Sequence, residues 1–217
     1  MIPELGHYAL VLALGLGLIQ SIAPVIGARV RDAALMRLAS TTALMQFAFV
    51  ATSFAALTYC YVTSDFSVVS VFENSHSMMP LIYKVTSVWG NHEGSMLLWG
   101  PHSVAVRRVG FAIRQQSAGN AEGVSAGGAI LDRLRLLSLH FAHLESVPAY
   151  GAAPLEGRDL NPILQDIGLA IHPPLLYLGY VGFSIAFSFA IAALIEGRID
   201  AAWARWCGHG RSPRGWL

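Results

Sequence analysis

Three long runs without a charged residue constrain this chain more than any of its other features. No Asp, Glu, Lys or Arg occurs in residues 5–28, 38–64 or 167–195. A helix needs about 20 residues to cross the roughly 30 Å hydrocarbon core of a bilayer, and each run is longer than that. We therefore predict an all-α integral membrane protein with about three transmembrane helices, which form a fragment of a larger polytopic bundle.

Composition agrees with a membrane protein and excludes other classes. The chain is 54% hydrophobic and 12% charged, whereas soluble domains are typically about 25% charged. A formal net charge of +1 offers no large basic surface, so we expect no nucleic-acid partner. The two cysteines, Cys60 and Cys207, share no motif spacing, which argues against redox chemistry.

The first run has the alternative interpretation of a signal peptide. It lacks the basic region that opens such peptides, and its apolar stretch is too long for their hydrophobic core. We therefore predict that it is a membrane span.

Basic residues in the short connections predict the orientation of the spans. Arg29, Arg31 and Arg37 lie near the first connection, where Asp32 is the one acid, and positive loops stay cytoplasmic. The N-terminus and the segment after the second span then face outward. The third span starts outside and ends inside, where Arg198 and Arg205 follow it.

The stretch "LAIHPPLLYLGYVGF" (169–183) places His172 directly before two prolines. Proline is favoured in the first helical turn, where its missing N–H has no intrahelical partner. We therefore expect both prolines in the first turn of the helix, where they hold the His172 ring at the outer interface. Two roles stay open on the residues alone, a metal-binding imidazole and a hydrogen-bonded histidine at a helix end.

Two further polar stretches lie on the predicted outer side. "WGNHEGSMLLW" (89–99) contains His92 and Glu93, with a hydrogen-bonded structural role favoured for His92 over a ligand role. Trp89 and Trp99 suit the membrane interface. "EGRDLNP" (156–162) contains Arg158, which is expected to serve an interfacial loop rather than to bind an anionic group.

Residues 100–151 break the apolar pattern abruptly. One interpretation is an extra-membrane insertion with an amphipathic helix over 130–144. The other is out-of-frame translation. Read one base later, the codons of Gly100-Pro101-His102 permit Val-Leu-Ile, and those of 144–148 permit Ser-Asn-Pro-Phe. Read one base earlier, those of 206–210 permit Val-Arg-Pro-Trp. We hypothesise that residues 100–151 and 207–217 are frameshift products.

With these segments set aside, the sequence resembles a known family. "WGNHEGSMLLW", "PLEGRDLNPILQDIGLAIHPPLLYLGYVGFSIAFSFAIAALIEGRIDAAWARW" and the opening "MIPELGHYALVLALGLGL" are similar to the N-terminal portion of the CcmF family of cytochrome c-type biogenesis proteins, the bacterial haem lyase subunits. The resemblance covers residues 1–99 and 154–206. The family's Ser-Asn-Pro-Phe and Arg-Pro-Trp stretches are those that the shifted frames permit.

The resemblance implies a role for His172. In the family, the histidine of the "HPPLLY" motif faces the periplasm and is one of two axial ligands of a haem that the chaperone CcmE delivers. His92 and Arg158 are weaker cofactor-binding candidates by the same comparison. The implied partners are CcmE, other haem lyase subunits, apocytochrome c and the lipid bilayer. The implied location is the bacterial inner membrane, with several spans and a periplasmic N-terminus.

The resemblance is incomplete. The family's Trp-rich periplasmic signature and second periplasmic histidine have no counterpart in this sequence. We expect an N-terminal membrane region (1–99), an out-of-frame or irregular segment (100–151), a periplasmic loop with the third span (152–206) and an out-of-frame tail (207–217). The predicted function is haem binding and presentation within a haem lyase complex. An inactive truncated fragment and a haem-exporting transporter remain alternatives.

Overall fold

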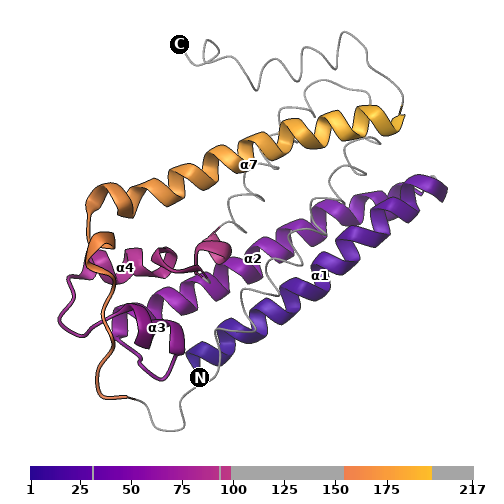
Figure 1. The fold of residues 1–217 in the computed structure, drawn as a ribbon. Helices are drawn as coiled ribbons and strands as arrows, with labels where there is room; N and C mark the ends of the chain where they lie inside the picture. The colour runs from indigo at the N-terminus through magenta and orange to yellow at the C-terminus, as the bar shows by residue number, and fades with distance from the viewer. Residues whose placement is uncertain (31, 93, 99–153, 197–217) are drawn as a thin grey trace.

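The computed structural model describes residues 1–30, 32–92, 94–98 and 154–196, and every regular element within these ranges is helical. Two long helices, α1 (Ile2–Val30) and α2 (Ala33–Thr63), form an antiparallel hairpin (Figure 1). The short helices α3 (Val69–Asn74) and α4 (Leu81–Gly90) follow. A 3-10 turn, η1 (Pro162–Leu164), leads into the long helix α7 (Ile167–Glu196). The expected all-α class is confirmed.

The predicted frameshift segments, 100–151 and 207–217, lie outside the described residues, as does the alternative amphipathic helix at 130–144. The frameshift and the domain boundaries drawn from it stay predictions.

The turn between α1 and α2 is tighter than the expected arginine-bearing loop. Arg29 lies within α1 and Arg37 within α2. The Asp32 carboxylate caps α2 by accepting hydrogen bonds from the backbone N–H groups of Ala34 (2.7 Å) and Leu35 (3.4 Å). Such a cap satisfies amides that have no partner inside the helix, so α2 can start directly after α1 ends.

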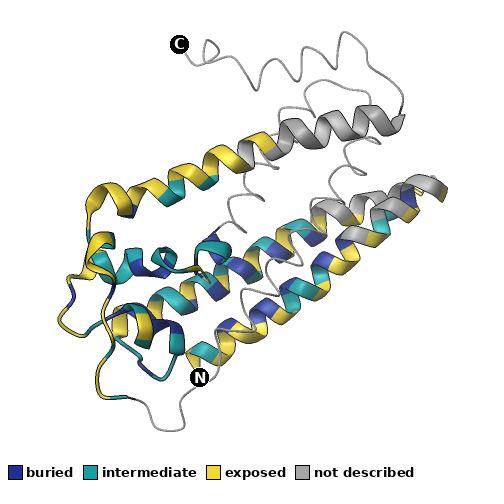
Figure 2. Cartoon of the chain, in the orientation of Figure 1, coloured by how far each residue is buried: buried dark blue, intermediate teal, exposed yellow. Residues whose placement is uncertain are grey.

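Small and polar residues line the contact between α1 and α2. Gly6 shows how close the two backbones are, because a Cβ added there would lie 3.0 Å from the Cβ of Ala56. The Gln46 side chain donates a 3.4 Å hydrogen bond across the interface to the carbonyl of Ala13. Close approach through small residues and a few polar bonds is typical of helix pairs in membranes. Figure 2 shows the resulting line of buried residues between the two helices.

Two helical segments, Ile2–Gln20 and Thr41–Thr63, are long and apolar enough to cross a membrane, among the residues that the structure describes. They correspond to the first two predicted spans. The helix predicted over 167–195 is present as α7, and its crossing of the membrane stays a prediction.

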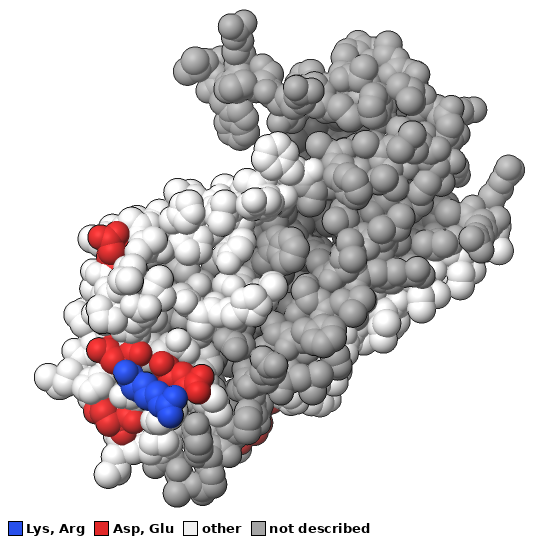
Figure 3. Space-filling model, in the orientation of Figure 1, with Lys and Arg blue, Asp and Glu red and all other residues white. Residues whose placement is uncertain are grey.

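One end of the molecule collects the short elements. The N-terminus of α1, helices α3 and α4 and the beginning of α7 all lie there, whereas the turn between α1 and α2 lies at the other end (Figure 1). On the face shown in Figure 3, charged side chains gather at this end, and the described surface along α7 beyond its start is uncharged. We call this end, residues 64–92 and 154–166, the cap.

Candidate functional site

Helix α7 starts where the uncharged run 167–195 begins, which is earlier than the two prolines suggested. Asp166 precedes it, and its carboxylate accepts hydrogen bonds from the backbone N–H groups of Gly168 (2.8 Å) and Leu169 (3.2 Å). The helix therefore begins at Ile167. The expectation that Pro173 and Pro174 lie in its first turn is wrong, because both lie inside the helix.

The two internal prolines change the hydrogen bonding of the preceding turn. Each lacks the N–H that would bond to the carbonyl four residues earlier, which leaves the carbonyls of Leu169 and Ala170 without an amide partner in the helix. The Ala170 carbonyl instead accepts a 2.8 Å hydrogen bond from the indole N–H of Trp89. Trp89, expected as an interfacial anchor, therefore joins α4 to α7.

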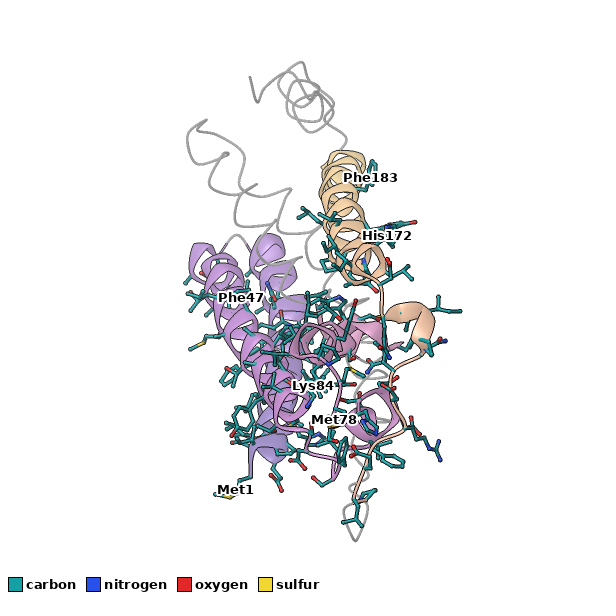
Figure 4. All side chains as sticks on the ribbon, turned by 90° about the vertical axis from the view of Figure 1, so that its left-hand side faces the viewer. Met1, Phe47, Met78, Lys84, His172 and Phe183 are labelled. Atoms are coloured by element: carbon teal, nitrogen blue, oxygen red, sulfur yellow. The ribbon has the colours of Figure 1, made fainter. Side chains whose placement is uncertain are left out.

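His172 is exposed on the side of α7 that faces away from α4. Ala170 on the opposite side is buried, and Pro173, Pro174 and Tyr177 are half-buried. Figure 4 shows His172 and Phe183 along α7, away from the α1–α2 hairpin that carries Phe47. The expectation of an accessible imidazole agrees with this placement.

The face around His172 is apolar and open. At helical spacing it contains these exposed residues: Gly168, His172, Leu175, Leu176, Gly179 and Phe183. A Cβ added at Gly179 would meet no atom of the described residues within 4 Å, whereas one at Gly168 would lie 2.9 Å from an oxygen of the Asp166 carboxylate. The surface is therefore open on the Gly179 side of the imidazole, and on the Gly168 side the Asp166 carboxylate lies close to the helix. We call these six residues the His172 face.

The His172 face offers one imidazole to a metal centre. Among the described residues, no group of three or more His, Cys, Asp or Glu side chains could hold a metal ion. Haem iron already has four porphyrin nitrogens, so a protein supplies only axial ligands. A single exposed imidazole on an apolar surface therefore fits a haem.

His92 is exposed, and its ring makes no hydrogen bond to any residue that the structure describes. Glu93 lies outside the described residues. The neighbouring Asn91 is the better-connected member of this motif. Its side-chain amide donates to the hydroxyls of Tyr61 (2.6 Å) and Ser70 (2.9 Å), and its side-chain carbonyl accepts from the N–H of Gly94 (2.7 Å).

This hydrogen-bond network ties the motif to the end of α2. Tyr61 is fully buried, and its hydroxyl also bonds to the backbone carbonyl of Ser70 at 2.8 Å. Buried polar groups are usually paired in this way, since an unpaired one is costly. Sequence reasoning missed Asn91 and Tyr61, because their partners come from separate elements.

Arg158 lies in a segment that crosses α3, and its side chain already has partners. The guanidinium lies 3.9 Å from the Glu73 carboxylate and 5.3 Å from the centre of the Phe72 ring. The backbone N–H of Arg158 donates to the Phe72 carbonyl at 2.7 Å. These contacts favour the loop-holding role that was expected for Arg158 over the binding of an anionic group.

Glu156 fastens the same segment. Its carboxylate accepts hydrogen bonds from the hydroxyl (2.6 Å) and N–H (2.9 Å) of Ser77. These bonds, with smaller contributions from the N–H of Gly157 and from His76, lower the pKa of Glu156 from 4.5 to about 2. Glu156 and Arg158 thus hold residues 154–160 against α3 and the loop after it. We call this segment the strap.

The three residues predicted to bind a cofactor do not form one cluster. Within the described residues, no hydrogen bond, ion pair or ring contact joins any two of His92, Arg158 and His172. His172 is the member of this set with an open apolar surface around it.

The signal that could have revealed the role of Trp89 was Pro174. A proline at this position leaves the carbonyl four residues earlier without its helical partner, so the carbonyl needs another donor.

Comparison with known proteins gives a consistent relationship. CycK of Bradyrhizobium diazoefficiens, a cytochrome c-type biogenesis protein, is 60% identical over 211 residues, covering 95% of this chain and 31% of CycK. CcmF of Pseudomonas aeruginosa is 49% identical over 210 residues, covering 95% of this chain and 32% of that protein. CcmF of Escherichia coli is 41% identical over 213 residues, with coverages of 94% and 32%. The chain thus spans about a third of the length of these relatives.

A solved structure of the cytochrome c haem lyase CcmF has the same fold, with a TM-score of 0.78, 22% identity and coverage of 97% of this chain and 33% of that one. The model of the family described as "Cytochrome C assembly protein" matches residues 89–212, more than half of the chain. This chain belongs to the cytochrome C assembly protein family.

Proposed function

We propose that this chain binds haem through His172 on the outer side of a bacterial inner membrane, and presents it for attachment to apocytochrome c. The observation that carries the proposal is the His172 face, an exposed imidazole on an uncharged helix with open space at Gly179 among the described residues. The family and its relatives support a role in cytochrome c biogenesis.

The residues of the His172 face have separate tasks in this proposal. The neutral His172 imidazole would hold the iron through one nitrogen. Leu175 and Leu176, one turn along α7, would cover part of the apolar macrocycle and exclude water from it. Haem, when bound, supplies the vinyl groups that react with cysteine thiols and most of the reactivity. The chain contributes binding and orientation.

The proposed partners are the haem chaperone CcmE, other haem lyase subunits and apocytochrome c. The family resemblance supports all three. The cap is the proposed docking side, because it lies at the same end of the molecule as the beginning of α7 (Figure 1).

Haem titration in detergent tests the proposal. Purified chain with His172→Ala is expected to lose the absorption bands of histidine-ligated haem, while His7→Ala, which changes another exposed histidine, keeps them. His92→Ala tests the weaker candidate and is expected to bind as the parent does. Equal binding by the parent and His172→Ala would refute the assignment, and absence of binding by the parent would favour an inactive fragment.

Chemical labelling tests the orientation. Leu155 in the strap and Val30 at the opposite end are both exposed, so each can carry a single cysteine in a chain with Cys60→Ala and Cys207→Ser. A membrane-impermeant maleimide added to spheroplasts is expected to label Leu155→Cys and to spare Val30→Cys. The reverse pattern would place His172 on the cytoplasmic side and overturn the proposal.

A further inference from the structure

Pro174 leaves one backbone carbonyl of α7, that of Ala170, without its usual hydrogen-bond donor. In an uninterrupted helix, the N–H of residue 174 would donate to the carbonyl of Ala170. Proline has no N–H, and Ala170 is buried, so water cannot readily take its place. A carbonyl in this position needs a donor from elsewhere in the protein.

Trp89 supplies that donor from a rigid part of the cap. Its indole N–H lies 2.8 Å from the Ala170 carbonyl oxygen. The indole also packs against a cluster of buried side chains from the end of α2, the turn after it, α3 and α4, namely Cys60, Tyr61, Phe66, Val71 and Val88. The bond therefore links α7 to the best-packed region of the described structure.

The position of this bond on the helix determines where His172 points. Residues two positions apart in an α-helix are separated by about 200° of rotation about its axis. Ala170 and His172 therefore lie on opposite sides of α7. When Trp89 holds the Ala170 side against α4, the imidazole is directed away from α4. Among the described side chains of α7 through Phe183, Ala170 is the buried one, and Pro173, Pro174 and Tyr177 on the same side are half-buried.

We propose that Trp89 is a positioning residue for His172, acting through the Ala170 carbonyl that Pro174 leaves free. The proposal rests on the proposed function of His172 as a haem ligand. It assigns to Trp89 a role beyond the membrane-interface anchor that its residue type suggests.

A double-mutant cycle tests this role. Trp89→Phe keeps an aromatic ring and removes the donor. Pro174→Ala restores an N–H that can bond to the Ala170 carbonyl within the helix. Pro173→Ala is the matched control, because it restores an N–H for Leu169, whose carbonyl is not the partner of Trp89.

Two readouts are measured on each full-length variant in detergent. One is haem affinity from absorption titration. The other is hydrogen exchange of the backbone amides of residues 169–172 in the chain without haem. Trp89→Phe is expected to weaken haem binding about three- to tenfold and to speed exchange by a similar factor, as for the loss of one hydrogen bond. Pro174→Ala is expected to remove most of both effects, and Pro173→Ala to leave them intact.

The outcomes distinguish a failure of the positioning role of Trp89 from a failure of haem binding by His172. Unchanged haem affinity and hydrogen exchange in Trp89→Phe would overturn the positioning role of Trp89. The role would also be overturned if Trp89→Phe weakened haem binding equally in the Pro173→Ala and Pro174→Ala backgrounds, since the effect would then reflect lost packing of the indole. If Trp89→Phe does not fold alone, the pair of double mutants provides the same comparison. If His172→Ala binds haem as the parent does, the proposed function fails, and the exchange data still decide whether Trp89 positions α7.

Discussion

The α1–α2 hairpin and α7 are built from similarly long uncharged runs, but they are held in different ways. The hairpin has close backbone contact at Gly6 and Ala56 and a side-chain bond from Gln46 to Ala13. Along α7 through Phe183, most described side chains are exposed, as Figure 2 shows. The hairpin is fixed by its own packing, whereas the start of α7 is fixed by contacts with the cap. The freer helix is also the one that carries the candidate ligand.

The largest expected difference comes from adding bulk to each helix. Gly6→Leu would push a side chain into Ala56 and Ser53 of α2, and overpacking of this kind typically costs about 1–3 kcal/mol. Gly179→Leu enters space where a Cβ meets nothing within 4 Å, so its effect on stability is expected to stay within about 0.5 kcal/mol. Unfolding of both variants in mixed detergent micelles measures the difference.

The same pair tests the His172 face. Gly179→Leu adds bulk beside the imidazole and is expected to weaken haem binding, whereas Gly6→Leu acts on folding alone. If Gly179→Leu destabilises the chain as much as Gly6→Leu does, α7 is packed at Gly179 as tightly as the hairpin is at Gly6.

Removing one hydroxyl is expected to have the next largest effect. Tyr61→Phe leaves the Asn91 amide and the Ser70 carbonyl without one of their partners, and burial of such unpaired groups costs about 1–3 kcal/mol. Tyr180→Phe changes an exposed side chain on α7 and is expected to be nearly neutral. Thermal unfolding followed by circular dichroism compares the two, and equal midpoints would mean that water replaces the lost hydroxyl at Tyr61.

The three long helices could be predicted from the sequence, because burial in lipid requires uncharged runs of a length set by the bilayer. The cap could not be predicted in the same way. Its helices are short, and its contacts join residues far apart in sequence, such as Ser77 with Glu156 and Trp89 with Ala170. No local periodicity encodes such pairs.

For the candidate site, sequence reasoning found an exposed His172 but misplaced the two prolines, which it put in the first turn of the helix. It relied on the preference of proline for the first turn, whereas the Asp166 carboxylate starts the helix earlier. A helix-capping carboxylate bonds to amides two or three residues ahead, so the sequence itself contains the signal at Asp166. The Trp89 donor required the three-dimensional structure. The frameshift prediction concerns residues outside the described ranges, and resequencing the gene decides it: an uninterrupted frame would refute it.

The carboxylates that cap the N-termini of α2 and α7 are expected to differ in what their removal affects. Loss of a helix-capping carboxylate typically costs about 0.5–2 kcal/mol. Asp32→Ala acts on the packed hairpin and should lower the midpoint of unfolding. Asp166→Ala is expected to loosen the first turn of α7 with a smaller change in that midpoint, seen as faster hydrogen exchange at Gly168 and Leu169. If both variants lowered the midpoint equally, α7 would unfold together with the hairpin, and the two regions would not differ in how they are held.

The smallest expected effect depends on pH and concerns the strap. Hydrogen bonds from Ser77 lower the pKa of Glu156 from 4.5 to about 2 in the folded chain, so the ionised carboxylate stabilises the folded strap. This contribution is complete above pH 4.5 and is lost as the pH falls toward 2, because protonation then becomes favourable in the folded state as well. Hydrogen exchange at Ser77 and Gly157 should accelerate over this range after correction for intrinsic rates. Glu156→Gln should exchange faster at neutral pH and lose the pH dependence, whereas Glu73→Gln, which changes a half-exposed partner of Arg158, should keep it. A parent chain without this pH dependence would show that the strap is held by its backbone bonds to Phe72 and Ser75, and the start of α7 would then depend on Trp89 and Asp166 alone.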